Sequence, residues 1–202
     1  MTAHVLDVES PIRTLRLRSN REALVSLAML DDPREPIGAG EACCEDSVLE
    51  RTRGELAAYF AGGLRDFTVP LAPAGTPFQL RVWEALRAIP FGTTQSYREV
   101  AIRIGQPTAT RAVGLANGRN PIAVIVPCHR VIGADGSLTG YGGGLRRKRI
   151  LLDHEARCCG ATGSEPAACG PDRGPLPAAA RPHLMPGPSC VTDAPGAGMG
   201  RS

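Results

Sequence analysis

The stretch Pro127-Cys128-His129-Arg130 places a thiol directly beside an imidazole. It follows the apolar run Ile122–Val126, which is typical of a buried segment, so the thiol is expected at the edge of a core. A thiol attacks carbon only as its thiolate, and a cysteine with the ordinary pKa of about 8.5 is roughly 3% ionised at neutral pH. Because a neighbouring imidazole can act as the base, Cys128 is predicted to be a nucleophile. A buried structural cysteine is the alternative.

Further motifs stand around this cysteine in one fixed order. They are Arg111-Ala112-Val113-Gly114, Asn120-Pro121, Gly140-Tyr141-Gly142-Gly143-Gly144 and Leu151-Leu152-Asp153-His154-Glu155. Together with the cysteine motif they resemble the methylated-DNA–protein-cysteine methyltransferases, which repair O6-alkylguanine. The resemblance runs from Thr76 to Glu155, is loose before that segment and is absent after it.

The resemblance implies an enzyme that works once. It would transfer the methyl or other alkyl group of O6-methylguanine in double-stranded DNA to its own Cys128, after flipping the nucleotide out of the duplex, and O4-methylthymine is a further implied substrate. The product is a thioether, which has no ionisable proton and is a poor leaving group. One molecule is therefore expected to repair one lesion.

The resemblance also assigns the groups that activate the thiol. His129 would act through a water as the base for Cys128, and Glu155 would orient and charge the imidazole. A carboxylate near a helix end more often simply faces solvent, which is the alternative for Glu155.

Two positions are expected to contact the flipped nucleotide or the gap it leaves. The hydroxyl of Tyr97 would meet the target phosphate and guanine N3, and Arg111 would enter the base stack. Arg119 is expected to bind DNA as well. A core tyrosine and a surface arginine are the alternatives.

The remaining expected site residues form the guanine pocket. Asn120 would tie the helical segment to the cysteine loop, and backbone groups of Cys128 and Val131 would bind the guanine edge. Tyr141 would wall the pocket. Gly142 stands where several relatives carry serine, so recognition there would rest on the amides of Gly142 and Gly143.

The net charge of +3 hides an uneven distribution. Residues 76–155 hold 11 Lys and Arg against 5 Asp and Glu, whereas residues 1–75 hold 8 against 12. A positive domain binds the phosphate backbone by releasing condensed counterions, so any nucleic-acid surface is expected in residues 76–155. A solvated charged face is the alternative.

The chain is predicted to have an α/β (α+β) fold in three parts. Residues 1–75 would form a small strand-and-helix domain, ribonuclease H-like by resemblance. Residues 76–155 would form the mainly helical DNA-binding and methyl-acceptor domain with a helix-turn-helix. Residues 156–202, in which Pro, Gly and Ala predominate, would be a disordered tail.

The element pattern is read from periodicity and capping residues. The expected strands are 15–18, 24–30 and 67–69, and a loop is expected over 31–45. The expected helices begin at Asp46 or Ser47, at Pro77, at Ser96 and near Thr108 to Thr110, and the last spans 145–155. The helices at Pro77 and Ser96 each follow a capping box.

No cofactor, metal or nucleotide site is expected. The seven cysteines show no C-x-x-C spacing, and too few ligands stand near the N-terminus for zinc. With neither a signal peptide nor a membrane span in view, we expect a cytoplasmic monomer. Two other functions are alternatives. One is a damage sensor that binds DNA without transfer, against which Cys128 argues; the other is a thiol hydrolase, whose catalytic pair adjacent Cys and His side chains rarely form.

Overall fold

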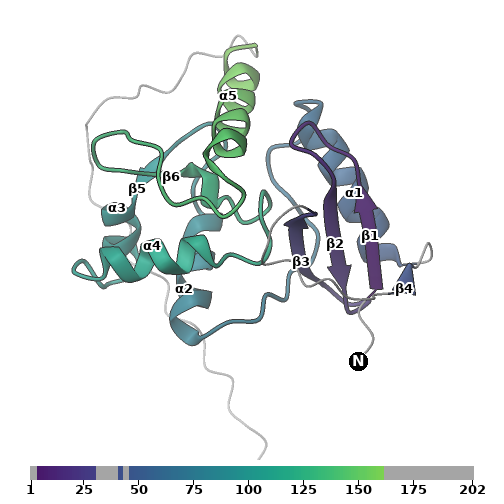
Figure 1. Ribbon diagram of the computed structural model, residues 1–202, viewed down its shortest axis with the longest axis horizontal. Coiled ribbons are helices and arrows are strands. Elements are labelled where there is room, and N and C mark those ends of the chain that lie inside the picture. The colour runs from purple at the N-terminus through teal and green to yellow at the C-terminus, as the bar shows by residue number, and fades with distance from the viewer. Residues whose placement is uncertain (1–3, 31–40, 43–45, 162–202) are drawn as a thin grey trace, which may run out of the picture. The chain divides into compact units, whose positions relative to one another are not determined.

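A computed structural model describes residues 4–30, 41–42 and 46–161 (Figure 1). The loop expected over 31–45 lies outside the described residues, except for residues 41–42. Most of the tail expected to be disordered lies outside them as well. All described residues belong to one compact unit of the chain.

The first part of the chain forms a four-stranded sheet (Figure 1). Its strands are β1 His4–Val8, β2 Leu15–Ser19, β3 Leu24–Met29 and β4 Glu41–Ala42, in the order β3-β2-β1-β4. The hairpin of β2 and β3 confirms the sequence prediction, whereas β1 was not foreseen. Leu15 and Leu17 of β2 are buried and Arg16 and Arg18 are half-buried, which is the alternation of a strand with one face on a core.

Helix α1, Ser47–Phe60, packs on this sheet. Asp46 caps it: the carboxylate accepts hydrogen bonds from the backbone amides of Val48 and Leu49 at 2.9 and 3.1 Å. Leu56 and Tyr59 bury their side chains toward the core. The helix predicted from Asp46 or Ser47 is confirmed.

The prediction of a strand over residues 67–69 is wrong. The Glu55 carboxylate of α1 accepts the amides of Thr68 and Val69 at 2.8 and 3.2 Å, so these donors are not available to a sheet. Backbone pairing with the sheet comes later in the chain, as one parallel bridge between Leu71 and Leu24. Pro70 lacks an N–H and cannot extend a ladder.

The next three helices pack on one another. They are α2 Pro77–Arg87, α3 Tyr97–Arg103 and α4 Thr110–Gly118. The capping boxes predicted at Thr76 and Ser96 are both present, and Pro77 occupies the first position of α2. Trp83 of α2 donates its indole N–H to the Ala116 carbonyl of α4 at 2.9 Å. Local signals thus located all three helices.

Short strands and a last helix complete the fold. β5 Gln95–Ser96 pairs in parallel with β6 Val131–Ile132, and α5 spans Leu145–Ala161. The prediction that this helix ends at residue 155 is wrong, and so is the disorder expected for residues 156–161. Tertiary contacts stabilise the extra turns: the side chains of Cys158 and Cys159 pack against the loops at Gly62 and Gly92.

The outer edge of β3 connects the sheet to the cysteine segment. Leu27 donates its amide to the Pro121 carbonyl at 2.9 Å, and Ala123 donates to the Leu27 carbonyl at 3.0 Å. The segment that precedes Cys128 is therefore hydrogen-bonded to the N-terminal sheet.

Candidate active site

Cys128 is the first residue of a 3₁₀ turn, Cys128–Arg130, and its exposed fraction is 4%. The buried run before it turns back on itself, and Val124 adopts φ +69°. This left-handed conformation is unfavourable for a β-branched residue and needs support from its surroundings. Asn120 gives that support. Its Nδ2 donates to the Val126 carbonyl at 2.7 Å and lies 3.1 Å from the Cys128 Sγ.

His129 and Glu155 form a buried pair. Their Nε2 and Oε1 atoms are 2.9 Å apart, and both residues have an exposed fraction of 0%. A carboxylate can only accept, so the imidazole carries its hydrogen on Nε2. The other nitrogen, Nδ1, has no hydrogen-bond partner within the part of the chain that the structure describes. Burial lowers the pKa of His129 more than the Glu155 carboxylate raises it, so the imidazole is neutral at pH 7.

Glu155 accepts three further donors that the sequence did not reveal. The Tyr59 hydroxyl lies 2.8 Å from Oε1, the Gly92 amide 2.9 Å from Oε2, and the Arg130 guanidinium 2.9 Å from Oε1. Burial alone would raise the pKa of Glu155, but the hydrogen bonds from His129 and Arg130, together with the charge of Arg130, outweigh it and hold the pKa at about 2. The carboxylate is therefore ionised and fixed in place.

Asn117 and Lys148 also lie at this site, and both were missed. Asn117 Nδ2 donates to the carbonyls of Cys128 and Gly140 at 3.3 and 3.4 Å. The fully buried Lys148 donates to the carbonyls of Val131 and Thr139, the latter at 2.7 Å. Burial lowers the pKa of Lys148 to about 8, although the Cys128 charge acts in the opposite direction.

A sequence signal for Lys148 did exist. It stands three residues before Leu151 and seven before Glu155, so all three share one helical face. The run of basic residues at 146–149 concealed that periodicity.

A cavity of about 270 Å³ opens beside Cys128. It brings together most of the residues expected to form a pocket and adds a wall from the N-terminal sheet. Its lining consists of Ser26, Leu27, Ala28, Met29, Asn117, Gly118, Arg119, Asn120, Pro121, Ala123, Cys128, Tyr141, Gly142 and Gly143.

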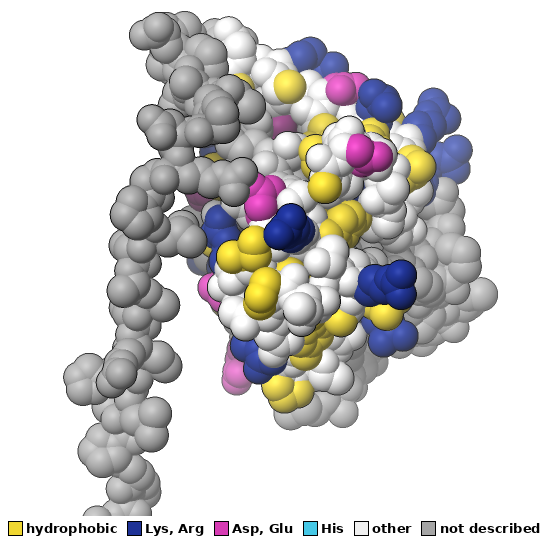
Figure 2. Space-filling model, turned by 90° about the vertical axis from the view of Figure 1, so that its left-hand side faces the viewer, with side chains coloured by type: hydrophobic (Ala, Val, Ile, Leu, Met, Phe, Trp, Pro, Cys, Tyr) yellow, Lys and Arg dark blue, Asp and Glu magenta, His cyan; other side chains and the backbone are white. Residues whose placement is uncertain are grey.

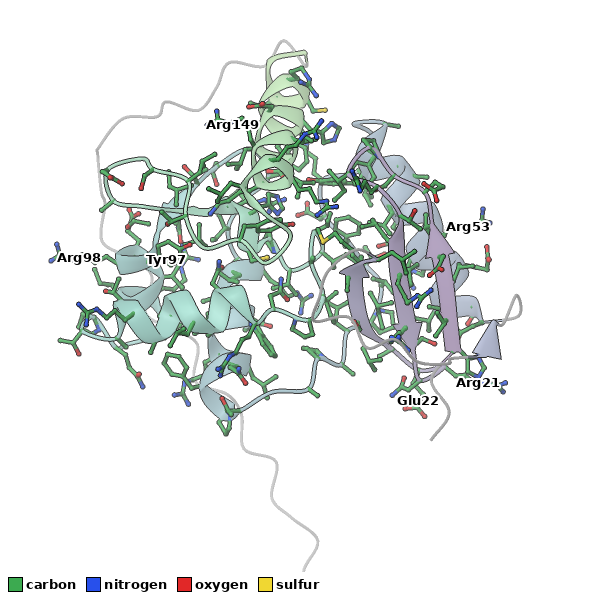
Figure 3. All side chains as sticks on the ribbon, in the orientation of Figure 1. Arg21, Glu22, Arg53, Tyr97, Arg98 and Arg149 are labelled. Carbon is green, nitrogen blue, oxygen red and sulfur yellow. The ribbon has the colours of Figure 1, made fainter. Side chains whose placement is uncertain are left out.

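Tyr97, Arg111 and Val131 do not line this cavity. The half-buried Tyr97 donates its hydroxyl to the Thr139 carbonyl at 2.9 Å (Figure 3). Burial raises its pKa. Arg111 is exposed on α4. The Val131 amide donates to the Cys128 carbonyl, so these two backbone groups bind each other.

The surface over α3 and α4 carries scattered cations. Figure 2 shows Lys and Arg side chains among apolar and neutral atoms on this side, with some acidic side chains between them. Arg98 of α3 points away from the body (Figure 3), and Leu115 of α4 has an exposed fraction of 65%. Such a surface suits a partner that is both charged and apolar.

Neither a metal-ligand cluster nor a membrane-spanning helix occurs in the part of the chain that the structure describes. Within residues 4–30, 41–42 and 46–161, His, Cys, Asp and Glu side chains nowhere gather in a group of three that could hold a metal ion. Among the same residues, no helix is long and apolar enough to cross a membrane.

Residues 77–157, which contain Cys128, His129 and Glu155, match the family model of the 6-O-methylguanine DNA methyltransferase DNA-binding domain. The fold gives a similar result. A crystal structure of Mycobacterium tuberculosis OGT in complex with DNA superposes with a TM-score of 0.69 at 50% identity, covering 77% of this chain and 94% of that one. Fold and site together therefore define the class of 6-O-methylguanine DNA methyltransferases.

Whole-chain relatives narrow this class. The methylated-DNA–protein-cysteine methyltransferase of M. tuberculosis H37Rv is 52% identical over 152 residues, 75% of this chain and 92% of the relative. The protein of that name from Methanosarcina acetivorans is 50% identical over 151 residues, 74% and 96% of the two chains. The chain belongs to the methylated-DNA–protein-cysteine methyltransferases. It is accordingly an enzyme, a transferase whose acceptor is a protein cysteine.

Proposed function

We propose that this protein repairs double-stranded DNA by moving the alkyl group of O6-methylguanine onto Cys128. The observation that carries this assignment is the imidazole of His129, which is buried against the Glu155 carboxylate with 2.9 Å between Nε2 and Oε1. It adjoins Cys128 in sequence, its Nε2 is held by an ionised carboxylate, and its Nδ1 is free to accept a proton. A base in this state can withdraw the thiol proton through a water.

The reaction balances with groups of this chain. The thiol proton passes to His129, the Cys128 sulfur forms a bond to the alkyl carbon, and the bond from that carbon to guanine O6 breaks. The leaving guanine anion then takes up a proton, for which the Tyr97 hydroxyl is the proposed donor, and the proton held by His129 returns through water to the tyrosinate, so that both side chains end in their starting protonation states. That hydroxyl must first leave the Thr139 carbonyl, to which it is bonded here. The product is a stable thioether, so the proposed reaction is irreversible and stoichiometric.

The proposed DNA surface is the helix-turn-helix of α3 and α4. M. tuberculosis OGT has been crystallised with DNA, which supports a DNA partner for this chain. Arg111 is exposed at the start of α4 and Arg119 at its end, so both are accessible to a duplex. Flipping the nucleotide would bring the alkylated base into the cavity beside Cys128. The net positive charge of residues 76–155 favours the backbone contacts that offset the cost of flipping.

Several narrower assignments belong to the same proposal. We infer that Asn120, Tyr141, Gly142 and Gly143 line the guanine pocket, that Val131 supports it by donating its amide to the Cys128 carbonyl, and that O4-methylthymine is a second substrate. The proposed division assigns transfer and DNA binding to the part that begins at residue 76 and includes all of α5, which extends beyond the expected boundary at residue 155. A cytoplasmic monomer completes the proposal.

The test is stoichiometric transfer from a duplex that carries radiolabelled O6-methylguanine. Label should appear on Cys128 at one equivalent per molecule and never exceed it, with a mass increase of one CH₂ on the peptide that contains Cys128. Cys128→Ala should abolish transfer and retain DNA binding. Binding without transfer in the unaltered protein would instead support a damage sensor, and hydrolysis of a thiol ester without DNA binding would support a thiol hydrolase.

A further inference from the structure

The cavity beside Cys128 has one wall that no sequence motif indicated. Four consecutive residues of β3, Ser26–Met29, line it together with the cysteine loop. This strand is the edge strand of the N-terminal sheet. The N-terminal part of the chain therefore contributes to the space in which transfer would occur.

Met29 is the last residue of β3 and lies at the part of the cavity formed by Tyr141, Gly142 and Gly143. Its exposed fraction is 2%. A Cβ placed on Gly143 would lie 2.9 Å from Met29 Cε, 3.0 Å from Met29 Sδ and 2.8 Å from Tyr141 Cε1. The thioether and the tyrosine ring therefore both lie against Gly143, so Met29 is a packed part of the wall.

The position of this wall relative to Cys128 is fixed by the backbone. The two hydrogen bonds of Leu27 with Pro121 and Ala123 join β3 to the segment that leads to Cys128. Arg147 adds a second connection, because it donates to the Ile12 carbonyl at 3.0 Å and to the Gly143 carbonyl at 2.9 Å. A rigid wall can discriminate between adducts by size, whereas a mobile one would yield.

We propose that Met29 determines which alkyl groups fit beside Cys128, so that the N-terminal sheet sets the substrate range of the acceptor domain. This inference rests on the proposed transfer to Cys128. A methyl adduct needs little room, whereas a benzyl adduct carries a further phenyl ring that must fit between the walls of the cavity, and Met29 is part of one of these walls.

The experiment compares single-turnover rates for duplexes that contain O6-methylguanine or O6-benzylguanine. Met29→Ala should raise the benzyl-to-methyl rate ratio by about tenfold, the scale on which a few carbon atoms in an apolar pocket are discriminated. Met29→Leu, which retains most of the volume, should return the ratio toward that of the unaltered protein.

Leu15→Ala is the matched control. Leu15 is fully buried on β2 directly opposite Met29, but it does not line the cavity. The Leu15→Ala variant reproduces the loss of core packing without changing the cavity wall. Transfer rates of both variants are compared per active molecule, at a temperature where both are folded. An equal ratio in Met29→Ala and Leu15→Ala would overturn the inference while leaving transfer intact. Absence of any label on Cys128 of the unaltered protein would refute the proposed function itself.

Discussion

At the scale of single residues, Glu155 is the most connected group of the site. Its carboxylate holds His129, Arg130, Tyr59 and the Gly92 amide together without contact with solvent. An ion pair at this depth adds little stability over an apolar replacement of the whole pair. Removing one partner alone is costly, because a buried charge remains.

Glu155→Gln should therefore destabilise the protein by about 3 kcal/mol at pH 7, since Arg130 would be left uncompensated. The native pKa of about 2 is below the ordinary value of the carboxyl group. The stabilisation is thus complete above about pH 4.3 and is lost as the pH falls toward the native pKa. Urea unfolding across this range measures it, and the difference between the two proteins should shrink on acidification.

The control for this prediction is Glu84→Gln, because Glu84 pairs with Arg87 at the surface, where its side chain is 76% exposed. A loss of less than about 0.5 kcal/mol is expected there. Equal losses at positions 84 and 155 would contradict the account of Glu155.

Lys148 is the second residue whose charge shapes the site. Its native pKa of about 8, lowered chiefly by burial, is below the ordinary pKa of lysine. Between about pH 8 and 10.4 the unfolded chain binds more protons than the native one, so this residue makes the free energy of unfolding rise with pH. Relative to Lys148→Met, the unaltered protein should gain stability across that window.

Transfer should respond to the same substitution. The Lys148 ammonium and the Cys128 thiolate attract each other. Without the Lys148 ammonium the thiolate is less stable, so Lys148→Met should raise the pH at which the transfer rate is half-maximal. Arg149→Met, at the exposed neighbouring position, is the control. A pH–rate profile that is identical in all three proteins would show that Lys148 only supports the Val131 and Thr139 carbonyls.

At the scale of elements, the site depends on loops between helices. Gly92 follows α2, adopts φ +74° and donates its amide to Glu155. A Cβ at this position would collide with the Cys159 side chain of α5. The end of α5 and the loop after α2 therefore fit each other only with glycine at position 92.

Gly92→Ala should lower both stability and the transfer rate. Gly105→Ala provides a matched control, because Gly105 has φ +72° but nothing lies within 4 Å of its Cβ position. The Gly105→Ala control should lose only about 1 kcal/mol of stability, which is the cost of a left-handed backbone conformation for alanine, and should retain its transfer rate. Denaturant unfolding and single-turnover assays distinguish the two variants. Similar behaviour of both would argue against a role for the Gly92 amide.

Elements with local signals were predictable from sequence. Thr76 and Ser96 begin capping boxes, and Asp46 caps α1, so the starts of three helices followed from a few neighbouring residues. The failures concern distant partners. Residues 67–69 do not form the predicted strand, because the Glu55 carboxylate binds the Thr68 amide. Helix α5 continues past residue 155 because Cys158 and Cys159 pack against loops that are distant in sequence.

The same division holds for the candidate site. Cys128, His129 and Asn120 came from motifs, and the structure brings them together with Glu155. Tyr59 and Gly92 carry no local sign of their role, since only the folded chain brings them to the carboxylate. The contribution of β3 to the cavity was unreadable for the same reason: it depends on the hydrogen bonds of Leu27.

At the scale of the whole molecule, charge is divided between the two ends of the described chain. Residues 1–75 carry more acidic than basic groups, and residues 76–155 the reverse. A Lys or Arg side chain that contacts a phosphate releases about one counterion. Replacing such a side chain therefore changes both the affinity for DNA and the dependence of that affinity on salt. A cation in the acidic part that remains away from DNA changes neither.

Arg98→Ala should therefore weaken duplex binding and reduce the slope of log K against log salt concentration by about 1. Arg98 is exposed on α3 and extends from the proposed DNA surface (Figure 3). Arg53→Ala is the control, because Arg53 lies on α1 and pairs with Glu50 at 2.5 Å. Fluorescence anisotropy with a labelled duplex at several salt concentrations measures both. An unchanged slope in Arg98→Ala, or an equal reduction in Arg53→Ala, would place the DNA elsewhere than over α3 and α4.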